Sequence, residues 1–359
     1  MRILCVTNMY PGPGAPDYGA FVRDLCDALE DRGHEIRPAV IDTRARGPLK
    51  TPAKYGRLTA SAFAGARWAD VIYGHYLFPT GAVAAAAGRT ARRPWVMTAH
   101  GGDVANLERT SVRTATAAGL AGAAAVIAVS HYLADRLVRS GLRLPPMFVA
   151  NMGVDMSAFT ISDRAEARSR RGLLPDGPVI IAVGGLTERK DPLTLLLAFA
   201  RVRSALPAAQ LVFVGDGPLR RSLVQGAAHL GLGEAVTLTG AIQHADVADW
   251  MAAGDVLALV SRVEPLGLVA LEALACGRPV VATEEGGARE VVPPECGALV
   301  PPGNPVAIAA TLRTVIARQP APANCRQAAD RYALTRQAAI VEEILAGAVS
   351  GDLPNTNRA

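Results

Sequence analysis

Two glutamates flank the predicted start of a helix. Glu264 precedes the helix in a loop, and Glu272 lies about a turn and a half inside it. Gly267 suits the entrance, the helix is predicted from about Leu266 to Cys276, and Gly277 ends it. A helix start exposes unpaired backbone N–H groups at a positive dipole end, so it favours an anion such as phosphate. Because carboxylates accept hydrogen bonds from hydroxyl groups, this stretch predicts a phosphate seat between two hydroxyl-binding side chains.

A phosphate seat beside two hydroxyl acceptors fits a nucleotide-sugar, whose diphosphate lies between a ribose and a hexose. The alternative interpretation is a capped amphipathic helix whose glutamates point to solvent. Apolar neighbours of Glu272 predict that the helix is largely buried, which favours the ligand site over that alternative. These neighbours are Leu268, Val269, Leu271 and Leu274.

Lys190 and His100 are the other candidates for chemistry. Lys190 lies in the loop 185–191 after an apolar strand, in a chain that has only three lysines. His100 directly follows a strand and precedes two glycines, so we expect it at the binding edge of a sheet and not in the core. His75 and His131 also follow strands, where lining a site and completing a loop are equally good interpretations. The remaining histidines are expected at the surface: His34, His229 and His244.

Length and composition predict a globular protein of two domains. A chain of 359 residues is long for one core, and 50% hydrophobic with 19% charged residues excludes a disordered chain. Aromatic residues make up only 5%, which disfavours a stacking surface for single-stranded nucleic acid, and we expect no nucleic-acid partner.

The net charge of +5 is concentrated in the first half of the chain. Residues 1–160 carry 18 Lys and Arg against 12 Asp and Glu. This half could contact an anionic membrane surface or an acidic acceptor. A diffuse Arg-rich surface is an equally good interpretation, because no dense basic cluster occurs.

The five cysteines are scattered, odd in number and without C-x-x-C spacing. They predict free thiols in a cytoplasmic protein. The first residues have too short an apolar run for a signal peptide, and the longest apolar stretch, 120–129, is too short to span a bilayer. We therefore expect a soluble protein without a transmembrane segment, for which peripheral membrane contact is possible.

Apolar strands alternate with helical patterns twice along the chain. This alternation predicts an α/β protein with two parallel, doubly wound sheets, each covered on both faces. The predicted strands of the first sheet are Ile3–Thr7, Ile36–Ile41, Val71–Gly74, Trp95–Ala99, Ala125–Val129 and Phe148–Ala150. Those of the second are Val179–Gly184, Gln210–Val214, Val236–Thr239, Val256–Leu259, Val280–Thr283 and Ala298–Val300.

The domain boundary is predicted in the polar, Arg-rich segment after residue 160. The N-terminal Rossmann-like domain then covers 1–160 and the C-terminal one 161–333, while 334–359 form a helix that crosses back to the first domain. In doubly wound folds ligands bind beyond the carboxyl ends of the strands, so we expect the site in a cleft that the two domains face. Loops at about 42–68 and 105–115 are expected to bind the acceptor.

With these elements in place, the chain resembles the retaining glycosyltransferases of family 4, also called glycosyl transferases group 1, which have the GT-B fold. The glutamate pair followed by Ala-Cys-Gly-Arg-Pro-Val-Val is the most specific match, and Gly74–Pro79 is the weakest. Five further segments carry the resemblance: Tyr18–Val22, His100–Asp103, Gly153–Asp155, Val183–Lys190 and Gly215–Pro218.

The resemblance implies a donor site in the C-terminal domain. Glu272 would accept the ribose hydroxyls, and Glu264 would hold a hydroxyl of the transferred sugar. Backbone N–H groups of Gly267 and Leu268 would meet the distal phosphate, and Lys190 would neutralise the departing diphosphate. The nucleobase would lie near Gly215 and Gly240–Ala241.

The resemblance also assigns residues of the N-terminal domain. The backbone of Gly19 at a helix start would approach the phosphate, and His100 would contact the donor sugar near the reacting carbon. Asp103 and His75 are weaker candidates for placing the acceptor. No carboxylate stands out as a nucleophile, so retention implies a front-face route in which the departing phosphate oxygen takes the acceptor proton.

One position departs from the family pattern V-G-R-L-x-x-x-K. Gly185 stands where the family has an arginine that binds the diphosphate, and Arg189 is the candidate to replace it. No D-x-D motif occurs in the chain, which fits transferases that stabilise the diphosphate with cations and helix dipoles, so we expect no metal and no other cofactor.

Other functions are weaker fits to the sequence. The glycine-rich loop 12–19 lacks G-x-G-x-x-G, which disfavours an NAD enzyme. A glycan phosphorylase of this fold would be longer and would carry a Schiff-base lysine, for which the phosphate loop of Lys190 is the wrong place. A nucleotide-sugar epimerase or hydrolase, and a non-catalytic nucleotide-sugar-binding protein, remain alternatives. UDP is the commoner donor nucleotide among similar chains and GDP the next, and the hydroxyl acceptor could be a saccharide, a lipid-linked molecule or a small polar natural product.

Overall fold

The computed structural model describes residues 1–45 and 47–355. The chain divides into two compact units, which are described separately here. Unit 1 comprises Met1–Gly153 together with the segment that starts at Leu334, and unit 2 comprises Val154–Ala333. The division thus falls at Gly153, a few residues before the predicted boundary at 160. Gly153 has a φ of +75°, and a Cβ there would lie 2.5 Å from the Cα of Leu334, so a larger residue would not fit beside the returning chain.

Unit 1 is built on a six-stranded parallel sheet with the order β2-β1-β3-β4-β5-β6. The central strands β3, β4 and β5 are buried along their whole length, because helices cover both faces of the sheet. The strands are β1 (Arg2–Thr7), β2 (Glu35–Val40), β3 (Val71–His75), β4 (Trp95–Ala99), β5 (Ala125–Ala128) and β6 (Met147–Val149).

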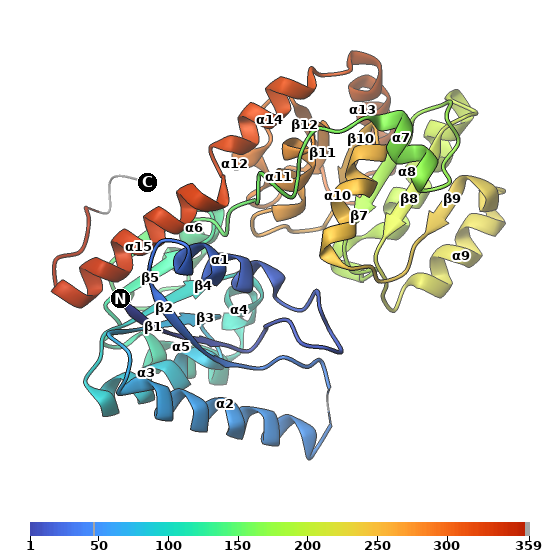
Figure 1. Ribbon diagram of the computed structural model, residues 1–359. Helices are drawn as coiled ribbons and strands as arrows, with labels where there is room; N and C mark the ends of the chain where they lie inside the picture. Colours follow the sequence, from blue (N-terminus) through green and yellow to red (C-terminus); the bar gives the residue numbers. More distant parts are fainter. Residues whose placement is uncertain (46, 356–359) are drawn as a thin grey trace. The chain divides into compact units, whose positions relative to one another are not determined.

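The helices of unit 1 form two layers. Helices α1, α6 and α15 cover one face of the sheet, and α2, α3 and α5 cover the other (Figure 1). Helix α1 buries Val22, Leu25 and Leu29 at the three-to-four-residue spacing of an amphipathic helix. The helices are α1 (Ala20–Glu30), α2 (Lys50–Ala66), α3 (Thr80–Ala91), α4 (Gly102–Ala105), α5 (Thr110–Leu120), α6 (His131–Arg139) and α15 (Leu334–Ser350).

Unit 2 repeats this architecture with the sheet order β12-β11-β10-β7-β8-β9. Its core includes the fully buried Phe199 and Phe213, between β8 and α8. The strands are β7 (Val179–Val183), β8 (Gln210–Val214), β9 (Val236–Leu238), β10 (Val256–Leu259), β11 (Val280–Thr283) and β12 (Gly297–Val300).

Helices also cover both faces of the second sheet. Helices α8, α9 and α13 lie on one face, while α10 and α11 lie on the other, where α7 and α14 pack against them (Figure 1). The helices are α7 (Arg164–Arg170), α8 (Pro192–Ala205), α9 (Arg220–His229), α10 (His244–Ala253), α11 (Leu268–Ala275), α12 (Ala288–Val291), α13 (Pro305–Arg318) and α14 (Pro322–Asp330).

Each predicted strand is confirmed to within one residue at either end. The two predicted acceptor loops are wrong over most of their length. Helix α2 occupies 50–66 of the first, because Leu58, Ala62 and Ala66 form a buried stripe with a spacing of four residues. In the second, a short helical turn (Asn106–Glu108) leads directly into α5.

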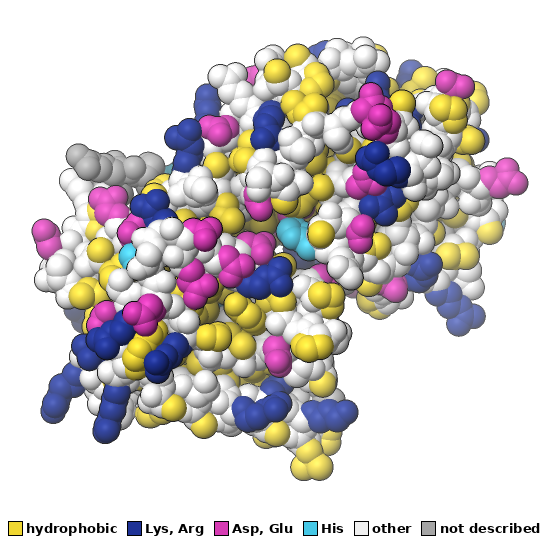
Figure 2. Space-filling model, viewed as in Figure 1, with side chains coloured by type: hydrophobic (Ala, Val, Ile, Leu, Met, Phe, Trp, Pro, Cys, Tyr) yellow, Lys and Arg dark blue, Asp and Glu magenta, His cyan; other side chains and the backbone are white. Residues whose placement is uncertain are grey.

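On the face shown in Figure 2, Lys and Arg side chains are spread among acidic and apolar side chains and do not merge into one patch. This distribution agrees with the diffuse interpretation of the positive charge on that face. Within residues 1–45 and 47–355, no helix is both long enough and apolar enough to cross a membrane. All five cysteines are buried as free thiols.

Candidate functional site

The sheet order of unit 2 creates a crevice between β7 and β10. The chain proceeds outward from β7 in one direction as β8 and β9, and in the other as β10, β11 and β12. At such a reversal the loops that follow the two neighbouring strands diverge, so their carboxyl ends leave an open space. A small cavity of about 30 Å³ lies at this position, lined by the ends of β7 and β10 and by the loop that leads to α8.

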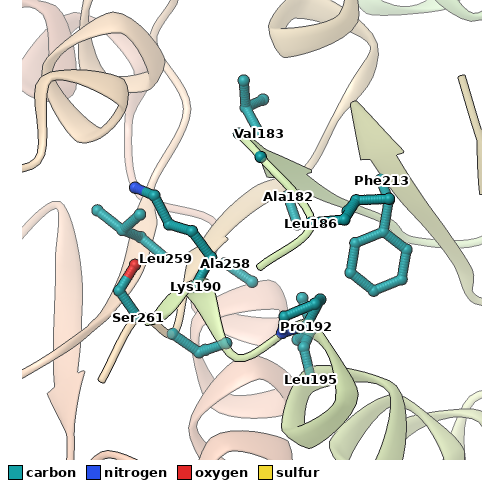
Figure 3. A pocket seen from close by; sticks show the side chains of 13 residues that line it. Ala182, Val183, Leu186, Lys190, Pro192, Leu195, Phe213, Ala258, Leu259 and Ser261 are labelled. Carbon is teal, nitrogen blue, oxygen red and sulfur yellow. The ribbon is translucent and has the colours of Figure 1, made fainter. Parts of the chain in front are cut away.

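The cavity has an apolar and a polar side. Leu186, Leu195 and Phe213 form the apolar side, and the polar ends of Lys190 and Ser261 lie together across from them (Figure 3). Lys190 ends a short helical turn (Glu188–Lys190), and the next residue, Asp191, is the N-cap residue of α8. The ammonium group of Lys190 and the hydroxyl of Ser261 therefore lie at the crevice, each within two residues of a helix or strand of unit 2.

Glu264 joins these two side chains through one carboxylate oxygen. The Nζ atom of Lys190 donates to Oε2 of Glu264 at 2.6 Å, and Oγ of Ser261 donates to the same oxygen at 2.9 Å. Glu264 is only 8% exposed. Burial acts to raise the pKa of Glu264, but the charge and hydrogen bond of Lys190, aided by Arg189 and Ser261, outweigh it and lower that pKa. Glu264 is therefore an ionised hydrogen-bond acceptor at neutral pH.

Hydrogen bonds to the segment that follows β11 fix the backbone of Glu264. Its carbonyl oxygen accepts from the N–H of Gly287 at 2.8 Å, and its N–H donates to the carbonyl of Glu285 at 3.3 Å. Gly286 has a φ of +121°, and a Cβ there would lie 2.1 Å from the carbonyl oxygen of Glu264. The glycine pair in Glu285-Gly286-Gly287 therefore permits the close backbone approach that holds the carboxylate in place.

Helix α11 starts directly after this loop, as the sequence predicted. Gly267 is its N-cap with a φ of +89°, no side chain caps the helix, and no acidic residue lies in its first turn. The helix extends over Leu268–Ala275, two residues later at its start than predicted, and Gly277 follows with a φ of +72°. No side chain therefore occupies its first N–H groups, including that of Leu268, as an anion site at a helix start would require.

Glu272 lies inside α11 and is only 4% exposed, as its apolar neighbours predicted. Its Oε1 atom lies 2.9 Å from Nε2 of His244, the first residue of α10. The prediction that His244 is a surface residue is therefore wrong, because this imidazole is two-thirds buried against the carboxylate. His34 was also predicted at the surface, but its ring is 8% exposed and bonds Glu342, whereas His229 is exposed.

The arginine position of the family pattern is open in unit 2. A Cβ added to Gly185 would make only ordinary contacts, 3.7 Å from Thr187 and 3.8 Å from the carbonyl oxygen of Asp216. Arg189 is more than half exposed, and its Nη1 atom lies 4.0 Å from Oε2 of Glu264. Arg189 therefore reaches the charge cluster from its outer side.

Gly215 and Gly240, predicted near a nucleobase, are adjacent in the structure. They form an isolated antiparallel bridge, and both have positive φ values, of 138° and 77°. A Cβ on Gly215 would lie 2.2 Å from the carbonyl oxygen of Gly184, which is itself in the cavity lining. These glycines bring the ends of β7, β8 and β9 together beside the cavity.

Unit 1 has its own reversal point between β1 and β3. Gly19 is the N-cap of α1 with a φ of +74°, and a Cβ there would lie 2.4 Å from the carbonyl oxygen of Met9. No side chain caps α1 and its first turn has no acidic residue, so its N–H groups are open to an anion.

His100 follows β4 and lies in a cluster with His75 and Asp103. Its Nε2 atom lies 3.1 Å from Nδ1 of His75, which is fully buried at the end of β3. Its backbone N–H donates to Asp103, whose carboxylate also accepts from the N–H groups of Leu77, Gly101 and Val104 at 2.8 to 3.0 Å. Burial raises the pKa of Asp103, and these backbone bonds act in the opposite direction. Asp103 therefore fixes the loop that carries His100.

Sequence reasoning missed three partners of the predicted residues. Ser261 and His244 complete the hydrogen bonds of the two glutamates, and Gly286 allows the loop of Glu264 to close. The run Glu285-Gly286-Gly287 after β11 was a visible signal for close backbone approach. Nothing in the sequence near His244 indicates its partner, because 28 residues separate it from Glu272.

The two doubly wound parallel sheets define the chain as a two-domain Rossmann-like protein of the GT-B class. Solved structures of the same fold include Anabaena HepE in complex with UDP-glucose, with a TM-score of 0.80, 26% identity, and coverage of 97% of this chain and all of HepE. The lipopolysaccharide glycosyltransferase WaaG, 19% identical with a TM-score of 0.73, shows the fold alone.

Sequence comparisons then give the family. Residues 163–332 match the family model for glycosyl transferases group 1, and residues 19–158 match the model for glycosyltransferase family 4. The chain is 34% identical over 299 residues to D-inositol 3-phosphate glycosyltransferase 1 of Catenulispora acidiphila, covering 78% of this chain and 68% of the relative. It is 27% identical to the putative teichuronic acid biosynthesis glycosyltransferase TuaC of Bacillus subtilis, covering 80% and 82% of the two chains. The chain belongs to the group 1, family 4 glycosyltransferases.

Proposed function

We propose that this glycosyltransferase moves a hexose-type sugar from a nucleoside diphosphate to a hydroxyl acceptor, with retention at the anomeric carbon and without a metal. The observation that carries the proposal is the contact of Lys190 with the ionised, buried Glu264 at the crevice between β7 and β10, next to the uncapped start of α11. A cation, free N–H groups and a hydroxyl acceptor in one place match a sugar diphosphate.

Each group then has a separate task on the donor. Glu272 accepts the ribose hydroxyls, and the N–H groups of Gly267 and Leu268 bind the distal phosphate. Glu264 holds a hydroxyl of the sugar, while Lys190 stabilises the charge that develops on the leaving diphosphate. Lys190 and Glu264 bond one another, and we propose that donor binding exchanges this contact for bonds to phosphate and hydroxyl.

Arg189, Gly215 and Gly240 complete the proposed donor contacts in unit 2. Arg189 replaces the family arginine that is absent at Gly185, and the two glycines border the nucleobase. UDP is proposed before GDP, which is supported by the UDP-glucose bound to HepE at 26% identity. The acceptor is a hydroxyl-bearing molecule: a saccharide, a lipid-linked molecule or a small polar natural product.

Unit 1 contributes Gly19 and His100 to this proposal. The open N–H groups at Gly19 approach the phosphate, and the ring of His100 contacts the transferred sugar. Asp103 and His75 were predicted to place the acceptor. Asp103 accepts four backbone hydrogen bonds and His75 is fully buried, so we propose instead that both residues position His100.

The proposed reaction proceeds on one face of the sugar. The bond from the anomeric carbon to the phosphate oxygen breaks, the acceptor oxygen bonds the same face of that carbon, and the acceptor proton passes to the departing phosphate oxygen. Lys190 and the start of α11 supply the positive charge that a metal gives in other transferases, which supports metal independence. We also propose a cytoplasmic location, because all five cysteines are buried as free thiols.

A thermal-shift panel with UDP, GDP and ADP sugars, without added metal, tests the donor site. A ligand at 100 times its dissociation constant stabilises the folded state by about 2.7 kcal/mol, so a true donor gives a clear shift. Glu272→Ala should abolish that shift, while the exposed Glu234→Gln should keep it. No shift with any nucleotide in folded protein would contradict the proposal.

Turnover without acceptor separates the remaining alternatives. An epimerase or hydrolase converts the nucleotide-sugar at full rate when it is alone, whereas a transferase does so slowly. A non-catalytic binding protein gives the thermal shift but no product with any acceptor. Product analysis by NMR then reports retention or inversion at the anomeric carbon.

A further inference from the structure

The hydrogen bond between His75 and His100 has a direction that the proposed function does not explain. The Nδ1 atom of His75 lies 3.1 Å from Nε2 of His100, and the rings are stacked with centroids 5.3 Å apart. Only one of the two nitrogens can carry the shared proton when both rings are neutral. The direction of the bond therefore fixes the tautomer of both histidines.

The second nitrogen of His75 indicates the direction. This Nε2 atom is sealed from solvent and has no hydrogen-bond partner among residues 1–45 and 47–355. If His100 donated, the proton of His75 would sit on Nε2 as an unpaired N–H in the core, which is rare and costly in folded proteins. If His75 donates from Nδ1, its Nε2 keeps only a lone pair.

We propose that His75 is a positioning residue that donates from Nδ1 to Nε2 of His100 and so holds His100 with its proton on Nδ1. The ring of His100 is fixed on other sides as well, with centroids 4.5 Å from Tyr76 and 5.3 Å from Phe21. Its Nδ1 atom has no hydrogen-bond partner within the described part of the chain and is not sealed from solvent. The N–H at Nδ1 is therefore the ring's free donor.

This arrangement makes His100 a hydrogen-bond donor and excludes it as a base. Its Nε2 lone pair is engaged by His75, and its Nδ1 already carries a proton. Burial, and secondarily the neighbouring His75, lower the pKa of His100, so the ring is neutral at pH 7. The identity of its partner rests on the proposed function: a sugar hydroxyl or phosphate oxygen of the donor accepts the Nδ1 proton. The acceptor's proton must then go elsewhere, which agrees with transfer to the departing phosphate.

Long-range proton–nitrogen NMR of donor-free protein, labelled with nitrogen-15 in the histidine rings, tests the tautomer directly. The His100→Gln spectrum assigns the signals by difference. We expect a protonated Nδ1 and an unprotonated Nε2 for His100 in the wild-type protein. A protonated Nε2 would overturn the proposal, and this measurement needs neither a substrate nor a variant of His75.

Two variants of His75 test whether this residue sets the tautomer. His75→Phe keeps a ring but removes the donor, whereas His75→Asn places an amide N–H near the position of Nδ1. We expect mixed tautomers and a fall in kcat of about three- to tenfold for the Phe variant, and recovery of both in the Asn variant. An unchanged His100 spectrum in folded His75→Phe would refute the role of His75. The expected tautomer in a protein that transfers no sugar from any donor would support this inference and reject the proposed function.

Discussion

Replacing Lys190 by methionine should destabilise unit 2 through the carboxylate that it leaves behind. Lys190 and Glu264 are 19% and 10% exposed in their side chains, and Nζ lies 2.6 Å from Oε2. Removing one member of a buried pair costs about 3 to 5 kcal/mol. We expect about 3 kcal/mol here, because Ser261 still donates to Glu264, Arg189 lies 4.0 Å away and Lys190 is partly solvated.

The effect of Lys190→Met should depend on pH in a defined direction. In the wild-type protein the pKa of Glu264 is lowered on folding, so its contribution to stability is present above the ordinary carboxyl pKa of 4.5 and is lost as the pH falls. Without Lys190, burial becomes the dominant influence and raises the folded-state pKa. The ionised Glu264 then destabilises the folded state, and protonation relieves this effect. The variant therefore gains stability relative to wild type as the pH falls toward 4.5.

Hydrogen exchange followed by mass spectrometry at pH 5 and pH 7 measures the prediction for unit 2 alone. Peptides from β10 to β11 report the opening free energy of this unit, without a two-state assumption for the whole chain. The double variant Lys190→Met, Glu264→Gln is the control and should recover most of the loss at pH 7. A cost below about 1 kcal/mol for Lys190→Met, or a double variant no more stable than it, would refute a buried ion pair.

Three further results are expected. Gly185→Arg should tighten donor binding about tenfold or more, because a Cβ fits at this position and a hydrogen bond from a charged group contributes about 1.5 to 3 kcal/mol. Calorimetry measures the affinity, and an unchanged value would show that the missing arginine does not limit donor binding. Arg189→Ala should weaken donor binding about tenfold in the same assay, and its matched control is Arg262→Ala, an exposed neighbour paired with Asp191. Turnover should persist in a chelator, and loss of activity that magnesium or manganese restores would contradict metal independence.

The elements were predictable from the sequence wherever the signal was local. Strand bounds followed from short apolar runs, and the start of α11 followed from Gly267 and the apolar residues around Glu272. Helix α2 was missed because its buried stripe after Leu58 consists of alanines, which carry little hydrophobic contrast. The same segment also contains several Arg, Pro and Gly residues, and Pro and Gly are typical of loops.

The candidate site was predictable as a set of residues but not as a set of contacts. The sequence singled out both glutamates and Lys190, yet the bond between Lys190 and Glu264 spans 74 positions and follows only from the sheet order. The pairing of His244 with Glu272 depends in the same way on how α10 packs on α11. Tertiary packing decides such pairs, and one sequence carries no local trace of them.

The discontinuity of unit 1 imposes an order on biosynthesis. Unit 2 is one continuous segment and can close its core once residue 333 has left the ribosome. The core of unit 1 is complete only after α15 has been synthesised, because this helix buries Val341, Ile344 and Leu345 against α1, β3 and β4. The first sheet to be translated is therefore the last to be covered, and its apolar face stays open to aggregation and to chaperones while the rest of the chain is made.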